Sequence, residues 1–179
     1  MALVSYVPDP LGGFVDEMCV AVSGAHCPPA HVTLLPRRPL RGNVDGVSEQ
    51  LRAVLGRFAP FEIELTGVCR FSTTDVIYLD IGEGTERLHQ IHDALNIGEL
   101  AHEEEFPFHP HLTIARPMPY LDINRLQRHV EAIWKVNPHS QRFTVSEAAL
   151  VWIGPTGVDG DWRRLWTAPL KAQRHVASS

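Results

Sequence analysis

The sequence has few of the residues that staple or anchor small proteins. Its 179 residues include only three cysteines, Cys19, Cys27 and Cys69, and they form no Cys-x-x-Cys pair. Such scattered cysteines argue against a disulfide framework and against a thiolate zinc site. We therefore expect three buried, reduced thiols and a cytoplasmic protein, because a chain of this length can build a core without covalent support.

Long apolar runs and an excess of positive charge are also absent. No stretch of about 18 apolar residues could span a membrane, and the first residues, MALVSYVPDPLGGF, lack the basic flank of a signal peptide. Sixteen Lys and Arg residues stand against 21 Asp and Glu, which gives a net charge of -5. A surface that is basic throughout, as in many nucleic-acid-binding proteins, is therefore excluded. We expect a soluble protein with no membrane or DNA partner.

The hydrophobic pattern predicts alternating strands and helices. Hydrophobic residues make up 44% of the chain, enough for an ordinary globular core. Period-two patterns and short apolar runs predict strands, listed in chain order as 3–7, 31–35, 61–65, 76–81, 111–115, 141–145 and 149–153. Apolar residues at helical spacing predict helices at 10–23, at 47–58, from Thr85 to 95 and from Asp122 to 133. Asn43 or Asp45, Thr85 and Asp122 are the expected N-caps.

Two of the predicted strands carry nearly the same motif, His-x-Thr. The first is His31-Val32-Thr33 and the second is His111-Leu112-Thr113, with the two histidines 80 residues apart. Each motif strand is followed by a Pro-rich loop, an amphipathic helix and two strands. A repeat of this size implies two similar lobes. If the lobes pack about a pseudo-twofold axis, both motifs face one cleft.

The motif suits phosphodiester chemistry. Residues two apart in a strand point to the same face, so each His shares a face with its Thr. An imidazole titrates near neutral pH, so one His can remove a proton while the other supplies one. The hydroxyls of Thr33 and Thr113 can hydrogen-bond the non-bridging oxygens of a phosphate. A single His-x-Thr would count as incidental, but two copies in equivalent places favour a divided active site.

With these two motifs, the chain resembles the 2H phosphoesterase superfamily, and within it the 2′-5′ RNA ligase-like, or LigT-like, branch. The resemblance rests on His31-Val32-Thr33-Leu34, on His111-Leu112-Thr113-Ile114, on their separation and on Pro110, and covers roughly residues 3–153. It implies an α+β, bilobal, pseudo-twofold fold with two antiparallel sheets around a central cleft flanked by helices. We expect residues 1–179 to form one domain of two intertwined lobes, with 171–179 as a loose tail.

The resemblance also implies an activity. Its members are metal-independent phosphodiesterases that commonly open 2′,3′-cyclic phosphates of nucleotides or RNA ends to 2′-phosphates, and some join RNA ends reversibly through a 2′-5′ linkage. In that frame His111 is the base and His31 the acid, although the near symmetry of the site allows the reverse, and Thr33 and Thr113 hold the phosphate. The implied partner is a nucleotide or RNA-end phosphate, with no cofactor or metal, and the protein is expected to be a monomer.

Several residues near the motifs have more than one possible role. Arg116 could pair with a phosphate oxygen or be a surface residue at a strand end. Arg37, Arg38 and Arg41 could bind an RNA backbone or form a solvated loop, and Glu103 to Glu105 is expected to be a solvated connector. The aromatic residues that could stack on a base are Tyr6, Phe71, Phe108 and Trp152.

Two other functions compete with the phosphodiesterase. One is a non-catalytic module that binds nucleotides or RNA ends on the same fold. The other is a metallohydrolase, because His109 and His111 together with His31 or His102 would supply three imidazoles. Pro110 disturbs the strand geometry that such a site would need, and neither motif contains an acidic ligand.

Overall fold

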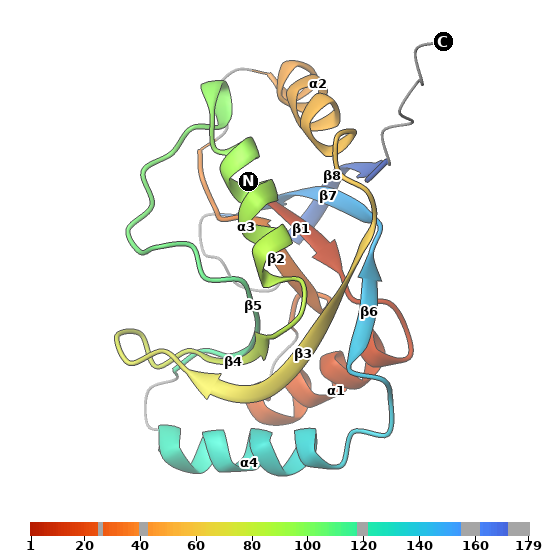
Figure 1. Cartoon of the computed structure of the whole chain (residues 1–179). Coiled ribbons are helices and arrows are strands. Elements are labelled where there is room, and N and C mark those ends of the chain that lie inside the picture. Colours follow the sequence, from red (N-terminus) through yellow and green to blue (C-terminus); the bar gives the residue numbers. More distant parts are fainter. Residues whose placement is uncertain (25–26, 40–42, 118–121, 155–161, 172–179) are drawn as a thin grey trace.

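The described part of the chain forms two four-stranded sheets, both antiparallel (Figure 1). The structure is a computed structural model that describes residues 1–24, 27–39, 43–117, 122–154 and 162–171. The first sheet has the order β2-β1-β7-β8, and its strands are β1 (Ala2–Tyr6), β2 (His31–Leu35), β7 (Glu147–Ile153) and β8 (Trp162–Pro169). The second has the order β5-β4-β3-β6, and its strands are β3 (Phe61–Arg70), β4 (Ile77–Ile81), β5 (His111–Ala115) and β6 (Arg142–Val145).

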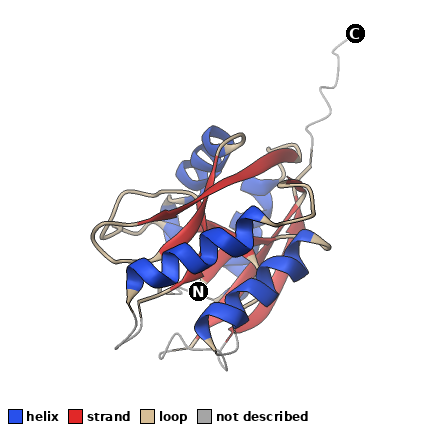
Figure 2. Ribbon diagram, turned by 90° about the horizontal axis from the view of Figure 1, so that it is seen from below, coloured by secondary structure: helices blue, strands red, loops and turns tan. Residues whose placement is uncertain are grey.

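Two pairs of helices cover the sheets. Their bounds are Leu11–Ser23 for α1, Val44–Leu55 for α2, Thr85–Leu95 for α3 and Ile123–Lys135 for α4, and a short 3-10 turn, η1, spans Gly98–Leu100. Helices α1 and α4 pack together against the second sheet, where they contact β5 and β3, and Figure 2 shows two helices running across that side. Helices α2 and α3 pack together against β8 and β2 of the first sheet.

Helices α1 and α3 each connect two strands of one sheet but pack on the other sheet. Helix α1 connects two strands of the first sheet but packs on β5, whereas α3 connects two strands of the second sheet but packs on β2. The order β1-α1-β2-α2 thus corresponds to β4-α3-β5-α4. This arrangement confirms the predicted α+β fold with two antiparallel sheets related by a pseudo-twofold axis. It also brings the edge strands β2 and β5, which carry the two motifs, into contact.

Burial fixes the orientation of both motif strands. Val32, Leu34, Leu112 and Ile114 are 0–3% exposed and belong to the main core. Burying each such side chain contributes about 1.5–3 kcal/mol. Because strand side chains alternate between faces, the same packing directs the intervening His and Thr side chains to the opposite face of each strand.

Most of the predicted elements are present, with several corrections. The side chains of Asn43 and Asp122 cap their helices as predicted, each accepting hydrogen bonds from backbone N–H groups. Thr85 is not a cap: Gly84 takes that position at φ 91°, and the Thr85 hydroxyl donates to the carbonyls of Ile81 and Gly82. A left-handed conformation of this kind favours glycine.

Two further corrections concern β8 and the cysteines. Strand β8 was not predicted, because the polar residues of Trp162–Pro169 do not follow a period of two. Of the three cysteines, only Cys19 is buried, and Cys27 and Cys69 are half-buried. Of the expected tail, residues 172–179 lie outside the described part of the chain.

Candidate active site

The two motif histidines begin the edge strands of the two sheets. His31 opens β2 and pairs in register with Tyr6 of β1, and His111 opens β5 and pairs with Asp80 of β4. Both histidines are half-buried, and they lie close enough for the charge of His111 to lower the pKa of His31. The fold therefore places the two imidazoles in one electrostatic environment.

The same hydrogen bond orients both rings. Nδ1 of His31 lies 2.8 Å from the carbonyl oxygen of Pro29, and Nδ1 of His111 lies 2.6 Å from that of His109. Because a carbonyl oxygen only accepts, each Nδ1 carries the proton and donates it. This fixes the tautomer and leaves each Nε2 as the atom that can take up or release a proton.

The pKa of His31 is strongly depressed. It falls to about 4, mainly because of burial, and the positive charges of His111 and Arg116 contribute to the lowering while the hydrogen bond to Pro29 opposes it. Since burial disfavours a charged imidazole, His31 is neutral at neutral pH.

The pKa of His111 is lowered too, but a carboxylate acts against the shift. Burial is the main cause of the lowering, and His109 and Arg116 add to it, while the hydrogen bond to the His109 carbonyl and the charge of Asp80 raise the pKa. Asp80 also accepts a hydrogen bond from Nε2 of His109 at 3.2 Å. The position that corresponds to Asp80 in the other half is Tyr6, which is neutral. The two histidines are therefore equivalent in backbone geometry but not in charge.

The remaining predicted site residues lie beside the histidines. Thr33 and Thr113 are half-buried, and within the described residues neither hydroxyl forms a hydrogen bond to the protein. Arg116 is exposed at the end of β5 and has no acidic partner among those residues, yet its charge reaches both imidazoles. Two hydroxyl groups and one guanidinium are thus available to a phosphate held between the histidines.

Aromatic side chains line both histidines. Near His111, the rings of Phe71 and Tyr78 stack with centroids 4.2 Å apart, and each meets the imidazole edge-on at 5.0 and 5.2 Å. Near His31, the Trp162 ring lies 4.7 Å from the imidazole and its Nε1 donates to the Tyr6 hydroxyl at 3.0 Å.

Of the four aromatic residues that the sequence suggested could stack on a base, two lie beside the motif histidines and two do not. Tyr6 and Phe71 lie beside the motif histidines. Phe108 stacks on His92 at 4.1 Å, and Trp152 lies under the guanidinium of Arg163, on the face of β7 opposite to Val151. Sequence reasoning missed Trp162, Tyr78 and Asp80. Tyr78 and Asp80 lie on β4, and their signal was that a strand pairing with a motif strand supplies neighbours of its histidine. Trp162 lies on β8, which pairs with β7, and had no such signal.

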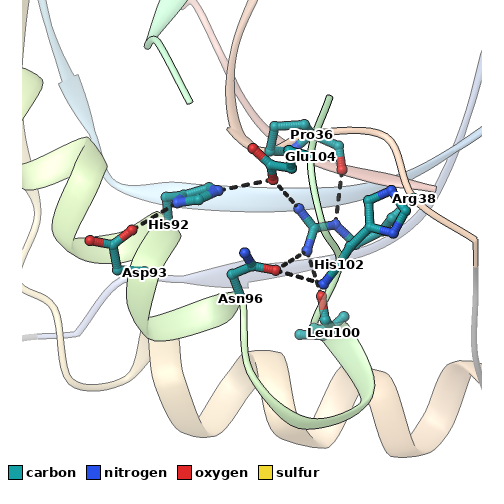
Figure 3. A network of polar contacts seen from close by, with 8 residues as sticks. All are labelled: Pro36, Arg38, His92, Asp93, Asn96, Leu100, His102 and Glu104. Atoms are coloured by element: carbon teal, nitrogen blue, oxygen red, sulfur yellow. Dashed lines mark hydrogen bonds and ion pairs between the residues drawn. The ribbon is translucent and has the colours of Figure 1, made fainter. Parts of the chain in front are cut away.

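The basic loop after the first motif is only partly solvated, because Arg37 is exposed but Arg38 is not. Arg38 is buried, and its guanidinium donates to Glu104 Oε1 at 2.6 Å and to Asn96 Oδ1 at 2.7 Å (Figure 3). Arg37 donates to the carbonyl of Gly154 at 3.0 Å, and Arg41 lies outside the described residues. In the acidic connector, Glu103 and Glu105 are exposed as expected, but Glu104 is mostly buried as the ion-pair partner of Arg38.

The histidines proposed as metal ligands have other contacts. His109 bonds to Asp80, and the backbone N–H of His102 donates to Asn96. Within the described residues no three His, Cys, Asp or Glu side chains are grouped so that they could hold a metal ion. No helix of the described chain is long and apolar enough to cross a membrane.

Known proteins with similar sequences are named phosphoesterases. A protein of Geobacillus thermodenitrificans named "Putative phosphoesterase" is 32% identical over 100 residues, covering 53% of this chain and 57% of the relative. A protein of the same descriptive name from Staphylococcus haemolyticus is 28% identical over 105 residues, covering 58% of this chain and 62% of the relative. The matched region thus spans little more than half the length of these relatives.

Solved structures share the fold over nearly the whole chain. TT0787 of Thermus thermophilus superimposes with a TM-score of 0.59 at 20% identity, covering 97% of this chain and 98% of that one. LigT of E. coli in complex with 3′-AMP gives 0.59 at 18% identity and covers 94% and 96%. The 2′-5′ RNA ligase superfamily profile matches residues 7–156. With both His-x-Thr motifs inside that range, the chain belongs to the 2′-5′ RNA ligase superfamily.

Proposed function

We propose that this protein is a phosphodiesterase that opens 2′,3′-cyclic phosphates of nucleotides or RNA ends to 2′-phosphates. The observation that carries the proposal is the matched pair of histidines. Each imidazole is fixed through Nδ1 by a carbonyl two residues earlier, and each keeps Nε2 for proton transfer. A phosphodiester bond can be hydrolysed by one base and one acid acting on opposite sides of phosphorus.

The charges around the histidines favour His31 as the base and His111 as the acid. A base must be neutral, and burial keeps His31 neutral down to a pH near 4. An acid must be protonated, and only His111 has a carboxylate, Asp80, that favours its charged form. This assignment reverses the expectation from the family resemblance, which made His111 the base.

In the proposed reaction, protons move between the two histidines, the attacking water and O3′. Nε2 of His31 takes a proton from water as the water oxygen bonds to phosphorus. The bond between phosphorus and O3′ breaks, and O3′ receives a proton from Nε2 of His111. The product is a 2′-phosphate monoester with a free 3′-hydroxyl. Proton exchange with solvent restores both imidazoles.

Bound phosphate improves the conditions for this chemistry. A phosphate anion between the rings stabilises the imidazolium form and therefore raises the pKa of His111, which burial lowers in the empty site. Thr33 and Thr113 are placed to donate to the non-bridging oxygens, and Arg116 supplies a positive charge. Donors that are already oriented lose little free energy to reorganisation in the transition state.

The relatives support a nucleotide substrate. LigT of E. coli has been crystallised with ATP, with 3′-AMP and with NADP+. We extend that chemistry to this chain: a nucleotide phosphate occupies the cleft between β2 and β5. Running the same acid and base roles in reverse joins a 2′-phosphate end to a hydroxyl, so 2′-5′ ligation is the second activity of this site.

Hydrolysis of nucleoside 2′,3′-cyclic phosphates in the presence of EDTA, with the product isomer identified, tests the proposal. We expect the 2′-phosphate, and we expect His31→Ala and His111→Ala each to lose about 10²–10⁴-fold in rate. His129→Ala, at an exposed position on α4, is the matched control and should keep full activity. Full activity in either motif variant refutes the proposal. Tight 2′-phosphate binding without turnover would instead indicate a binding module, and activity lost to EDTA would indicate a metallohydrolase.

A further inference from the structure

A second group of side chains lies beside His31 on the first sheet. The group consists of Tyr6, Trp162 and Arg164, and we call it the β8 wall. The Arg164 guanidinium lies over the Tyr6 ring, 4.6 Å from its centroid, and Trp162 donates to the Tyr6 hydroxyl at 3.0 Å. Tyr6 is the register partner of His31, so the wall begins one strand away from the catalytic imidazole.

Arg164 is suited to bind an anionic group of a ligand. It is exposed, and within the described residues no carboxylate pairs with it. The contact with the Tyr6 ring restricts the guanidinium, which reduces the entropy lost when it binds a ligand. Its positive charge is therefore available to an anionic part of a substrate bound beside His31.

The two halves of the site differ in the residue that faces each motif histidine across the strand pair. At the place that corresponds to Tyr6 stands Asp80, which pairs in register with His111. A negatively charged extension of the substrate is repelled by that carboxylate and attracted by Arg164. The two halves therefore differ in charge, and the difference favours a substrate whose negatively charged extension lies toward the β8 wall.

We infer that Arg164, stacked on Tyr6, binds a second phosphate of the substrate. The preferred substrate then carries, besides its 2′,3′-cyclic phosphate, either a 5′-phosphate or the phosphodiester of a preceding nucleotide. A guanidinium can bind two phosphate oxygens at once, which suits both groups. This inference rests on the proposed function for the reacting phosphate, but concerns a different contact.

Three substrates separate the possibilities. Adenosine 2′,3′-cyclic phosphate has no second phosphate, its 5′-phosphorylated form has a terminal one, and the dinucleotide ending in the same cyclic phosphate has an internal one. We expect kcat/KM to be about tenfold or more higher for at least one of the latter two, since hydrogen bonds to charged groups are among the strongest in proteins. Which of them gains identifies the source of the second phosphate.

The variant Arg164→Gln should remove this preference and leave the rate on adenosine 2′,3′-cyclic phosphate unchanged. Arg163→Gln is the matched control: Arg163 is the neighbouring exposed arginine, but it stacks on Trp152 and not on Tyr6. It should retain the preference. A preference that survives in Arg164→Gln, or an equal loss on all three substrates, overturns the inference.

Binding measurements keep this test independent of turnover. Calorimetry with adenosine 2′,5′-bisphosphate and adenosine 2′-monophosphate should show tighter binding of the bisphosphate by the unmodified protein and by Arg163→Gln, but not by Arg164→Gln. If that pattern holds without hydrolysis of any cyclic phosphate, the proposed function fails and the second-phosphate site stands. If hydrolysis is seen and both compounds bind equally to all three proteins, the site fails and the function stands.

Discussion

Removal of Arg38 should destabilise the whole domain. Its side chain is 2% exposed, and the Glu104 side chain that pairs with it is 14% exposed (Figure 3). The guanidinium donates to the carbonyls of Pro36 and Leu100, to Asn96 and to Glu104, all within 3.0 Å. One side chain thus joins the end of β2 to α3, η1 and the connector that leads into β5.

The magnitude follows from what Arg38→Met leaves behind. Burial lowers the pKa of Arg38 but Glu104 opposes this shift, so the two groups form a true ion pair. Without the guanidinium, Glu104 is a buried carboxylate whose remaining partner is Nε2 of His92 at 3.0 Å. Breaking a buried pair from one side costs about 3–5 kcal/mol. For a domain of this size the melting temperature should fall by roughly 6–20 °C.

Urea unfolding of the single and double variants measures the effect. We expect Arg38→Met to lose about 3–5 kcal/mol of unfolding free energy, and Arg38→Met with Glu104→Met to recover much of it, since two apolar side chains leave no unpaired charge. Arg128→Met, at an exposed position on α4, should change stability by less than about 0.5 kcal/mol. A loss below about 1 kcal/mol for Arg38→Met, or additive effects in the double variant, would refute the role of the network.

Three further predictions concern the site. The acid limb of the pH profile of kcat/KM should lie near pH 4, because His31 has to be neutral and its pKa is about 4; a limb near 6.5 would contradict the assignment of His31 as the base. Asp80→Asn should move the alkaline limb to lower pH, since Asp80 raises the pKa of His111, which has to be protonated; an unchanged limb would contradict the assignment of the acid. Thr33→Val and Thr113→Val should each lower kcat about 10²–10³-fold, because each removes one donor to the developing charge, with little change in melting temperature; wild-type rates would exclude this role.

The sequence by itself determined the local features of the site. Period-two burial of Val32, Leu34, Leu112 and Ile114 is a property of each strand alone, and it decides which face the histidines occupy. The caps at Asn43 and Asp122 are equally local, because a cap bonds to backbone only two or three residues further on. For this reason the motifs, the repeat and most helix and strand positions could be predicted.

The tertiary structure decided what surrounds the histidines. Tyr6 and Asp80 face them through strand pairing, and Trp162 reaches Tyr6 across 156 positions in the sequence, on a strand that the hydrophobic pattern did not reveal. Arg38 and Glu104 looked like solvated charges because nothing local shows that they pair. The pKa of an imidazole depends on burial and on charges within a few ångströms. The proposed choice of acid and base therefore rests on contacts that only the folded chain creates.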